Sequence, residues 1–367
     1  MLGAGVALAG RRVLRVGGED ALKLLQGIVS NDVRRLAEPG AAPVYAAIQN
    51  AQGRVEHDVF LHREMGDGPS GGALLADLPA EGFDAAVSLL RKMRLRARVT
   101  LDDAGDDLAV VATAADHDDD DDEGETEAEP HPLGALSFLP PDPRLHTLGL
   151  RGILPAAAAA ALLPEVAPNA PHLRADGDAA YREWRYRWGV AEGTAELAGL
   201  LPLEANLEGL NAISFDKGCY IGQELTARTH HRGVIRKRLV PAHFAVAAPR
   251  GDGEDSGDGD GDGDVDEIGD GTGDGVPRGA VSPGTPVRVA GDASGKPVGK
   301  VVASSGGVGL VMLRLARLEA MDAGEVSLVA GAGAGDGDGD GDGSGDGVAV
   351  RVRVPEWWPA AWRAPAT

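Results

Sequence analysis

Cysteine is almost absent from this chain. Cys219 is the only cysteine among 367 residues. A disulfide framework needs cysteine pairs, and a zinc or iron–sulfur site built wholly from the cysteines of one chain needs about four of them. The sequence therefore excludes both kinds of site. A metal or cluster bound at Cys219 would need further ligands from elsewhere.

Long hydrophobic runs are also missing. The longest apolar run, Ile153–Leu163, is rich in alanine, contains Pro155 and stops at Pro164. It is shorter than the ~20 residues that cross a bilayer, so we expect no membrane partner. The first 12 residues are too short for a secretion signal but are compatible with the tail of a transit peptide.

Negative charge is abundant but concentrated in a few places. The formal net charge is −22, and 26 of the 57 acidic residues lie in residues 116–129, 251–274 and 336–346, which contain no Lys or Arg. The rest of the chain holds 31 acidic residues against 35 basic ones and is mildly basic. A uniformly acidic protein of the halophile type is therefore excluded.

The acidic segments consist mainly of Asp and Gly. Because they have too little apolar surface to offset the entropy lost on ordering, we expect disordered loops at residues 116–129, 251–275 and 335–346. A calcium-binding alternative fails, since the segments lack the final Glu of an EF-hand loop and the recurrent apolar residue of a repeat-toxin roll. Their charge would repel phosphate, so we expect no nucleic-acid partner.

The remaining sequence indicates mixed helices and strands. Apolar residues at spacings of three and four predict helices over Leu22–Leu36 and Phe83–Met93. Strand patterns occupy residues 13–16, 44–48, 54–62 and 96–101. The second and third of these flank Asn50-Ala51-Gln52-Gly53, a hairpin turn. Hairpins in place of repeated βαβ units favour an α+β fold over a doubly wound parallel sheet.

After residue 180 the sequence has a different character. Tyr181, Trp184 and Trp188 follow helical spacing, which is typical of a helix that packs against a core. Short strand patterns separated by glycine turns come next, at residues 284–290, 299–304, 308–313 and 348–354. This arrangement predicts a small β-barrel.

The most informative segment surrounds the only cysteine. A thiolate is the form that attacks or ligates, and Lys217, Arg228 and the bases that follow could lower the pKa of Cys219. Gly218 and Gly222 would allow a tight turn. Residue chemistry alone indicates a reactive or metal-binding turn, and a buried structural cysteine remains the alternative. His230 and His231 are weaker candidate ligands.

The stretch K-G-C-Y-I-G-Q-E-L-T-A-R, Lys217 to Arg228, matches the motif of the YgfZ family, relatives of the glycine-cleavage T-protein. The continuation T-H-H-R-G-V-I-R-K-R-L resembles the mitochondrial branch, whose members assist iron–sulfur cluster assembly. Further similar segments are L-L-Q-G-I-V-S-N-D-V at 24–33, N-A-Q-G-R-V-E-H-D-V-F-L at 50–61, L-P-L-E-A-N-L at 201–207 and V-P-E-W-W-P at 354–359. The resemblance covers the chain except its acidic segments.

The resemblance implies a fold of three parts. We expect residues 1–45 and 146–240 to form a folate-binding-like domain that carries the motif. Residues 46–145 would form an inserted, ferredoxin-like α+β domain, and residues 241–367 a C-terminal β-barrel. Family members have shorter links where the acidic segments lie, a difference that surface loops tolerate because loop closure costs rise slowly with length.

The resemblance also implies a function. The first hypothesis is an assembly factor that works with an A-type carrier to mature four-iron four-sulfur enzymes in the mitochondrial matrix. The alternative is an enzyme, a tetrahydrofolate-dependent aminomethyltransferase. The cysteine count favours the first, since a cluster shared with a cysteine-bearing partner needs one thiolate from this chain.

The residues that carry these hypotheses lie in the motif and in the first third of the chain. Cys219 is the expected metal ligand, and no residue is assigned to catalysis. The expected cofactor-binding residues are Asn31, Asp32, Lys217, Gly218, Tyr220, Gly222, Gln223, Glu224 and Arg228.

Overall fold

The computed structural model describes residues 5–64, 72–113, 136–166, 177–246, 281–292, 294–318, 327–331 and 347–363. The three acidic segments lie outside these residues, so their expected disorder stays a prediction. Within the described ranges, no helix is long and apolar enough to cross a membrane.

The described strands form two sheets and a barrel. The first sheet has the order β3 (Val44–Gln49), β4 (Val55–Arg63), β5 (Leu74–Pro79), β2 (Arg11–Gly17) and β6 (Thr100–Asp103). The second has the order β1 (Gly5–Ala7), β7 (Leu108–Thr113) and β8 (Arg151–Pro155). The closed barrel runs through β10 (Pro286–Val289), β11 (Gly299–Ser305), β12 (Val308–Arg314), β9 (Lys237–Val246), β14 (Val348–Val352) and β13 (Leu328–Ala330).

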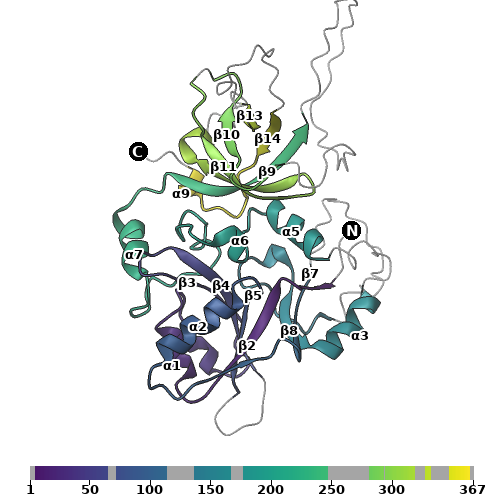
Figure 1. The fold of residues 1–367 in the computed structure, drawn as a ribbon, viewed down its shortest axis with the longest axis vertical. Coiled ribbons are helices and arrows are strands. Elements are labelled where there is room, and N and C mark those ends of the chain that lie inside the picture. The colour runs from purple at the N-terminus through teal and green to yellow at the C-terminus, as the bar shows by residue number, and fades with distance from the viewer. Residues whose placement is uncertain are drawn as a thin grey trace, which may run out of the picture.

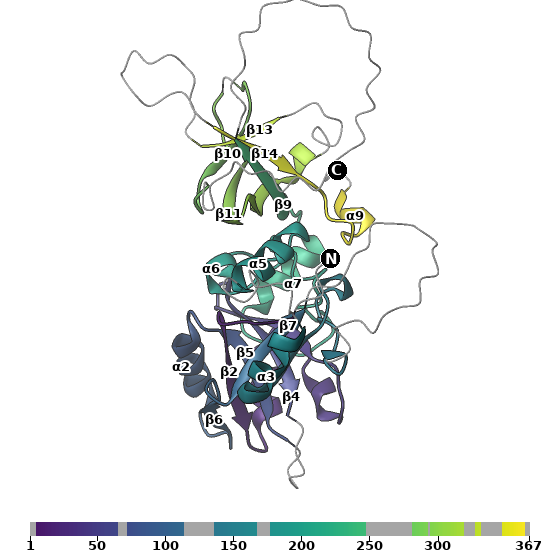
Figure 2. The same cartoon turned by 90° about the vertical axis from the view of Figure 1, so that its right-hand side faces the viewer.

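Short helices surround these sheets. They are α1 (Ala21–Gln26), α2 (Phe83–Arg94), α3 (Ala156–Val166), α5 (Gly177–Arg187), α6 (Thr194–Leu197), α7 (Gln223–Arg232) and α9 (Ala360–Arg363), with 3-10 turns at Arg34–Ala37, His146–Leu148 and Leu315–Arg317. Figures 1 and 2 show the barrel at one end of the molecule and the two sheets at the other, with α5 and α6 between them.

The expected fold class is confirmed. Every strand pair within the described ranges is antiparallel, which is the α+β arrangement, and the C-terminal barrel is closed. The hairpin of β3 and β4 and the helix α2 lie where the sequence predicts them. The first sheet pairs β2 with β5 and β6, so it crosses the expected domain limit at residue 45. The domain limits and the ferredoxin-like unit stay predictions.

Two predicted elements differ from the structure. The helix expected over Leu22–Leu36 ends at Gln26, because the Ser30 N–H donates to the Ala47 carbonyl at 2.9 Å and not to the Gln26 carbonyl, which accepts from the Lys217 ammonium. Val29, Val33 and Leu36 are nevertheless buried, since a turn also places residues at these spacings in the core. The strand expected at 96–101 starts only at Thr100, after a tight turn closed by Ala97 N–H donating to the Arg94 carbonyl.

A buried network of charged groups joins the two sheets. Arg151 of β8 donates to Asp77 of β5 at 2.7 Å, and Arg11 of β2 also contacts Asp77 at 2.6 Å. The Glu192 carboxylate accepts from Arg144 at 2.7 Å and from the Tyr181 hydroxyl at 3.1 Å. Arg144 and Arg151 are fully buried. Burial alone would raise the pKa of Glu192, but the guanidinium groups around it hold that pKa well below its usual value.

We expect Glu192→Ala to destabilise the fold strongly. The substitution leaves buried guanidinium groups without their anion, so the free energy of unfolding should fall by about 4 kcal/mol in urea titration. Glu19→Ala, which removes an exposed carboxylate, serves as the control and should change it by less than ~0.5 kcal/mol. A loss below ~1 kcal/mol at Glu192 would show that the network does not hold the sheets together.

The buried imidazole of His62 in β4 gives the fold an acid-sensitive step. Burial lowers the pKa of His62 from 6.5 to about 4. Between these values the unfolded chain binds a proton that the folded chain does not, so stability is lost as the pH falls. The loss should total about 3 kcal/mol and should disappear in His62→Leu. A variant that keeps the wild-type slope of unfolding free energy against pH in this window would contradict the assignment.

Candidate functional site

The cysteine lies in an irregular segment directly before α7. Cys219 is exposed and free, and its neighbour Gly218 is exposed as well. A methyl group added at Gly218 would meet no atom within 4 Å. The thiol therefore lies on an open part of the surface, and the alternative of a buried structural cysteine does not hold.

Lys217 anchors the segment that carries the thiol. Its ammonium donates to the main-chain carbonyls of Gln26 at 2.8 Å, Val29 at 2.6 Å and Asn31 at 2.9 Å. Burial lowers the pKa of Lys217 to about 8, and the charge of Asp32 opposes that shift. An ammonium has three N–H groups. All three are used on the turn, so Lys217 positions the Cys219 segment and has no N–H left for the sulfur.

Gly222 places the start of α7 against the hairpin turn between β3 and β4. Its φ is 82°, and a Cβ there would lie 2.6 Å from the Asn50 carbonyl oxygen. Gly53 of the hairpin approaches from the other side, with a would-be Cβ 2.9 Å from the Gly222 carbonyl oxygen. Only residues without side chains fit this contact. Gly222 therefore shapes the segment, whereas Gly218 has neither a positive φ nor a close neighbour.

The other motif residues divide into local supports and exposed groups. Gln223 accepts a hydrogen bond from Tyr220 N–H at 2.9 Å, which closes the turn before α7. The Lys217 ammonium lies 4.9 Å from the centre of the Tyr220 ring, and burial raises the pKa of Tyr220 to about 12. Glu224 and Arg228 are exposed on α7. These two side chains face solvent.

Asn31 and Asp32 lie beside the Lys217 anchor. The buried Asn31 amide donates to the carbonyls of Tyr45 at 2.8 Å and Asn211 at 2.6 Å, so both of its N–H bonds hold the backbone together. Asp32 forms an ion pair with Arg34 at 2.5 Å. Hydrogen bonds from Arg34 hold the pKa of Asp32 well below its usual value. Asn31 therefore has no free amide hydrogen for a ligand.

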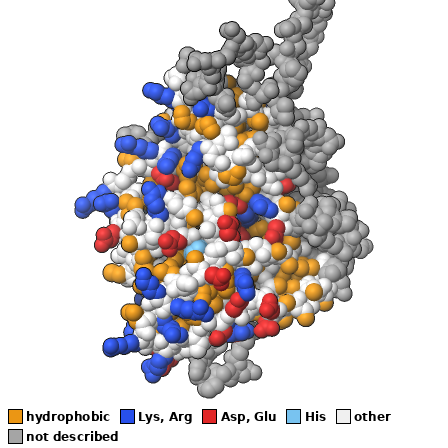
Figure 3. Space-filling model, viewed as in Figure 1, with side chains coloured by type: hydrophobic (Ala, Val, Ile, Leu, Met, Phe, Trp, Pro, Cys, Tyr) orange, Lys and Arg blue, Asp and Glu red, His pale blue; other side chains and the backbone are white. Residues whose placement is uncertain are grey.

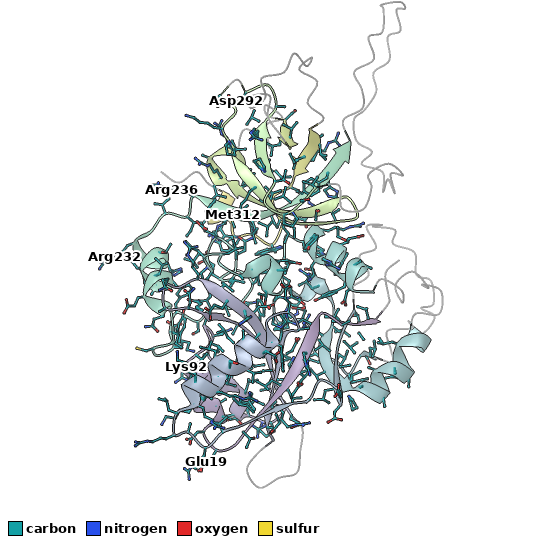
Figure 4. The ribbon with its side chains drawn as sticks, viewed as in Figure 1. Glu19, Lys92, Arg232, Arg236, Asp292 and Met312 are labelled. Atoms are coloured by element: carbon teal, nitrogen blue, oxygen red, sulfur yellow. The ribbon has the colours of Figure 1, made fainter. Side chains whose placement is uncertain are left out.

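The two histidines lie at the far end of α7. His230 stacks on Phe215 with ring centres 3.7 Å apart and contacts the Glu208 carboxylate at 3.3 Å. His230 lies seven positions after Gln223, which places the two about 10 Å apart along a helix. Figure 4 shows the neighbouring Arg232 and Arg236 pointing away from the molecule. The histidines are thus set apart from the Cys219 end of the helix.

The described part of the chain offers no other metal ligand set. It contains no group of three or more His, Cys, Asp or Glu side chains placed to hold a metal ion. Sequence reasoning missed two supports of the site, the buried Gln49, whose Oε1 accepts from Thr226 at 3.3 Å, and Gly53. The hairpin turn was visible in the sequence, but nothing there indicates that it packs against residue 222.

The two glycines beside Cys219 should respond oppositely to alanine. Gly222→Ala introduces a side chain at positive φ and a clash with backbone oxygen, so unfolding free energy should fall by about 3 kcal/mol. Gly218→Ala is the matched control and should leave it within ~0.5 kcal/mol of the wild type. Thermal and urea unfolding measure both. Equal losses of unfolding free energy at Gly218 and Gly222 would contradict the difference in their surroundings.

Comparison with known proteins places the chain in a family. Residues 236–360 match the family described as the CAF17 C-terminal beta-barrel domain. The mitochondrial iron–sulfur cluster assembly factor IBA57 of Homo sapiens is 33% identical over 367 residues, 96% of this chain and 84% of the relative. Its homologue from Chaetomium globosum is 36% identical over 336 residues, 87% of this chain and 72% of the relative.

The fold is shared more widely. The crystal structure of the glycine cleavage system aminomethyltransferase T from Bartonella henselae matches with a TM-score of 0.60 at 13% identity. It covers 97% of this chain and 86% of its own, a likeness that concerns the fold alone. The resemblance found in the sequence is confirmed: the chain belongs to the IBA57 family of iron–sulfur cluster assembly factors.

Proposed function

We propose that this chain assembles iron–sulfur clusters by holding a cluster jointly with a partner protein, to which it contributes the Cys219 thiolate. The relatives are named as mitochondrial iron–sulfur cluster assembly factors, which supports this activity and a mitochondrial location. The partner is an A-type carrier that supplies the remaining thiolates, and the clients are four-iron four-sulfur enzymes.

The count of ligands carries the proposal. An iron–sulfur cluster takes about four protein ligands, usually thiolates. The chain has one cysteine, it is exposed, and the described residues offer no metal-binding group of three. A cluster bound through Cys219 therefore needs ligands from a second protein. Sulfur is the soft ligand that iron–sulfur clusters select, so no nearby oxygen replaces it.

The anchoring of the turn suits this task. The Lys217 ammonium and the Gly222–Gly53 contact fix the backbone on both sides of Cys219. The open space at Gly218 lets a partner backbone approach the thiol closely. A ligand held in one place on an open surface loses little conformational entropy when the partner binds. From the sequence, Lys217 is expected to tune the charge at Cys219. We propose that Lys217 and Gly222 act by positioning the segment, whereas Arg228 acts through its charge on the exposed face of α7.

The second candidate function is that of a tetrahydrofolate-dependent aminomethyltransferase. The fold that this chain shares with such an enzyme favours it. The residues expected to bind folate argue for the first candidate instead. Both N–H groups of the Asn31 amide donate to main-chain carbonyls, and the Asp32 carboxylate forms an ion pair with Arg34, so these groups already have partners within the chain. We therefore assign the chain to cluster assembly and treat folate as the alternative that the following experiment also tests.

Cys219→Ser should separate the two functions. The variant keeps the size of the side chain but removes the sulfur, and because Cys219 is exposed the fold should remain as stable as the wild type. Reconstituted without oxygen with an A-type carrier, iron and sulfide, the wild-type pair should develop visible cluster absorption that the variant pair lacks.

The same variant should fail to restore four-iron four-sulfur enzyme activity in a deletion strain. His231→Gln, another exposed change in the motif region, is the control and should restore it. Full rescue by Cys219→Ser would remove Cys219 from the cluster. Loss of rescue by Asn31→Ala in a variant that folds and still forms the coloured complex would instead favour the folate alternative.

A further inference from the structure

A hollow lies between α1 and the C-terminal end of α2. Its volume is about 430 Å³, and its floor is apolar, formed by Leu24, Ile28 and Met93. Basic side chains line its rim, namely Lys23, Arg94 and Arg96, together with the carboxylate of Asp20. An apolar floor within a polar rim is the usual anatomy of a protein-binding surface.

The turn at the edge of this hollow carries an exposed leucine. Leu95 is 86% exposed, and its φ of 46° and ψ of −108° are close to those of the first central residue of a type II′ turn, a position that favours Gly. The Ala97 N–H closes the turn on the Arg94 carbonyl at 2.8 Å. Leu95 also lines a second hollow of about 690 Å³. A leucine in a glycine position costs stability, and the described residues leave this side chain almost fully exposed.

Some of the bases at the hollow have no polar partner among the described residues. Arg98 pairs with Glu19 and Asp20, and Arg94 donates to the Val99 carbonyl. Lys23 and Arg96 on the rim form no ion pair or side-chain hydrogen bond with any described residue, and neither does Lys92, which precedes the floor residue Met93 and does not itself line the hollow. Figure 3 shows Lys and Arg side chains at this end of the molecule, interspersed with Asp and Glu, as well as nearer the barrel, and Figure 4 shows Lys92 at the edge of this end.

Bases at the end of a helix also favour the helix dipole, which is the simplest account of Arg91 and Lys92. The interaction of these bases with the helix dipole explains neither the exposed leucine nor the apolar floor. It also leaves out Lys23, which belongs to a different helix. Together, the unpaired bases, the hollow and Leu95 fit an acidic ligand that carries an apolar side chain.

The hollow adjoins the anchor of the Cys219 segment. Gly27 and Ile28 line it, and the carbonyls directly before and after them, of Gln26 and Val29, bind the Lys217 ammonium. Ile221, two residues after Cys219, packs on the same core cluster as Leu24 and Met93. A protein segment lying in the hollow would therefore contact the turn that positions the thiol.

We propose that this hollow, with the rim bases and Leu95, is the docking site for an acidic segment of the cluster-sharing partner, which places an apolar side chain on the Leu24–Ile28–Met93 floor. The proposal rests on the function proposed above. The chain's own acidic segment at 116–129 has the charge, but Ala128 is its only apolar residue, so it does not supply the side chain for the floor.

The test measures docking without a cluster. All chains carry Cys219→Ser, and their affinity for the metal-free A-type carrier is measured at 50 and 300 mM NaCl by biolayer interferometry. Lys23→Gln, Lys92→Gln and Arg96→Gln together should weaken binding about 30-fold at low salt and remove most of its salt dependence. Leu95→Gly should weaken it about tenfold.

Two controls keep the result specific. Lys296→Gln, Lys300→Gln and Arg314→Gln remove three exposed bases of the barrel region and should leave the affinity unchanged. Leu95→Gly should keep or raise the melting temperature, because glycine suits the turn, so a weaker interaction cannot be ascribed to unfolding.

The outcomes separate this proposal from the function it builds on. No binding by the parent chain, equal losses in the two charge variants, or full affinity in Leu95→Gly would each overturn the docking site. Tighter binding of a synthetic 116–129 peptide than of the carrier would also overturn it. A coloured complex formed by Cys219→Ser would overturn the cluster assignment and leave the docking result standing.

Discussion

A buried ammonium group bound by three main-chain carbonyls is the contact on which the site depends. Lys217 reaches carbonyls of residues 26, 29 and 31, the first of them 191 positions away along the chain. A buried charge must be matched by dipoles, and here the dipoles belong to a turn whose own hydrogen bonds are made by Ser30 and Asn31. The Lys217 ammonium, the turn at residues 26–31 and the thiol segment therefore stabilise one another. Cys219 is exposed, but its backbone is anchored through the nearby Lys217.

The same fold can serve different chemistry, because function resides in the site that it carries. The likeness to an aminomethyltransferase extends over nearly the whole chain at 13% identity. Here the space between the two sheets holds Arg144, Arg151 and Glu192 in a buried ionic network. Such a network is neutral or weak as a source of stability when complete and costly when broken. Its ion pair between Arg151 and Asp77 connects the two sheets.

Sequence reasoning recovered the antiparallel elements, the barrel and the motif, because alternating and three-to-four spacings report which faces are buried. It failed after Gln26, where buried turn residues mimic a helical spacing. Gly222 could be identified as a turn residue, but its contact with Gly53 could not, since the two lie 169 positions apart. The use of all three N–H groups of Lys217 was equally invisible, because a sequence shows a lysine near a cysteine and not the direction in which the lysine points.

In the proposed function, one thiolate of this chain completes a cluster whose other ligands come from a partner. Native mass spectrometry of the chain with an A-type carrier, after reconstitution without oxygen, tests it most directly. We expect a complex containing one copy of this chain, at least one carrier and the added mass of a cluster, and Cys219→Ser should lose the cluster mass. If the Cys219→Ser complex keeps the cluster mass, or if that mass is found only on the free carrier, then Cys219 does not ligate a shared cluster.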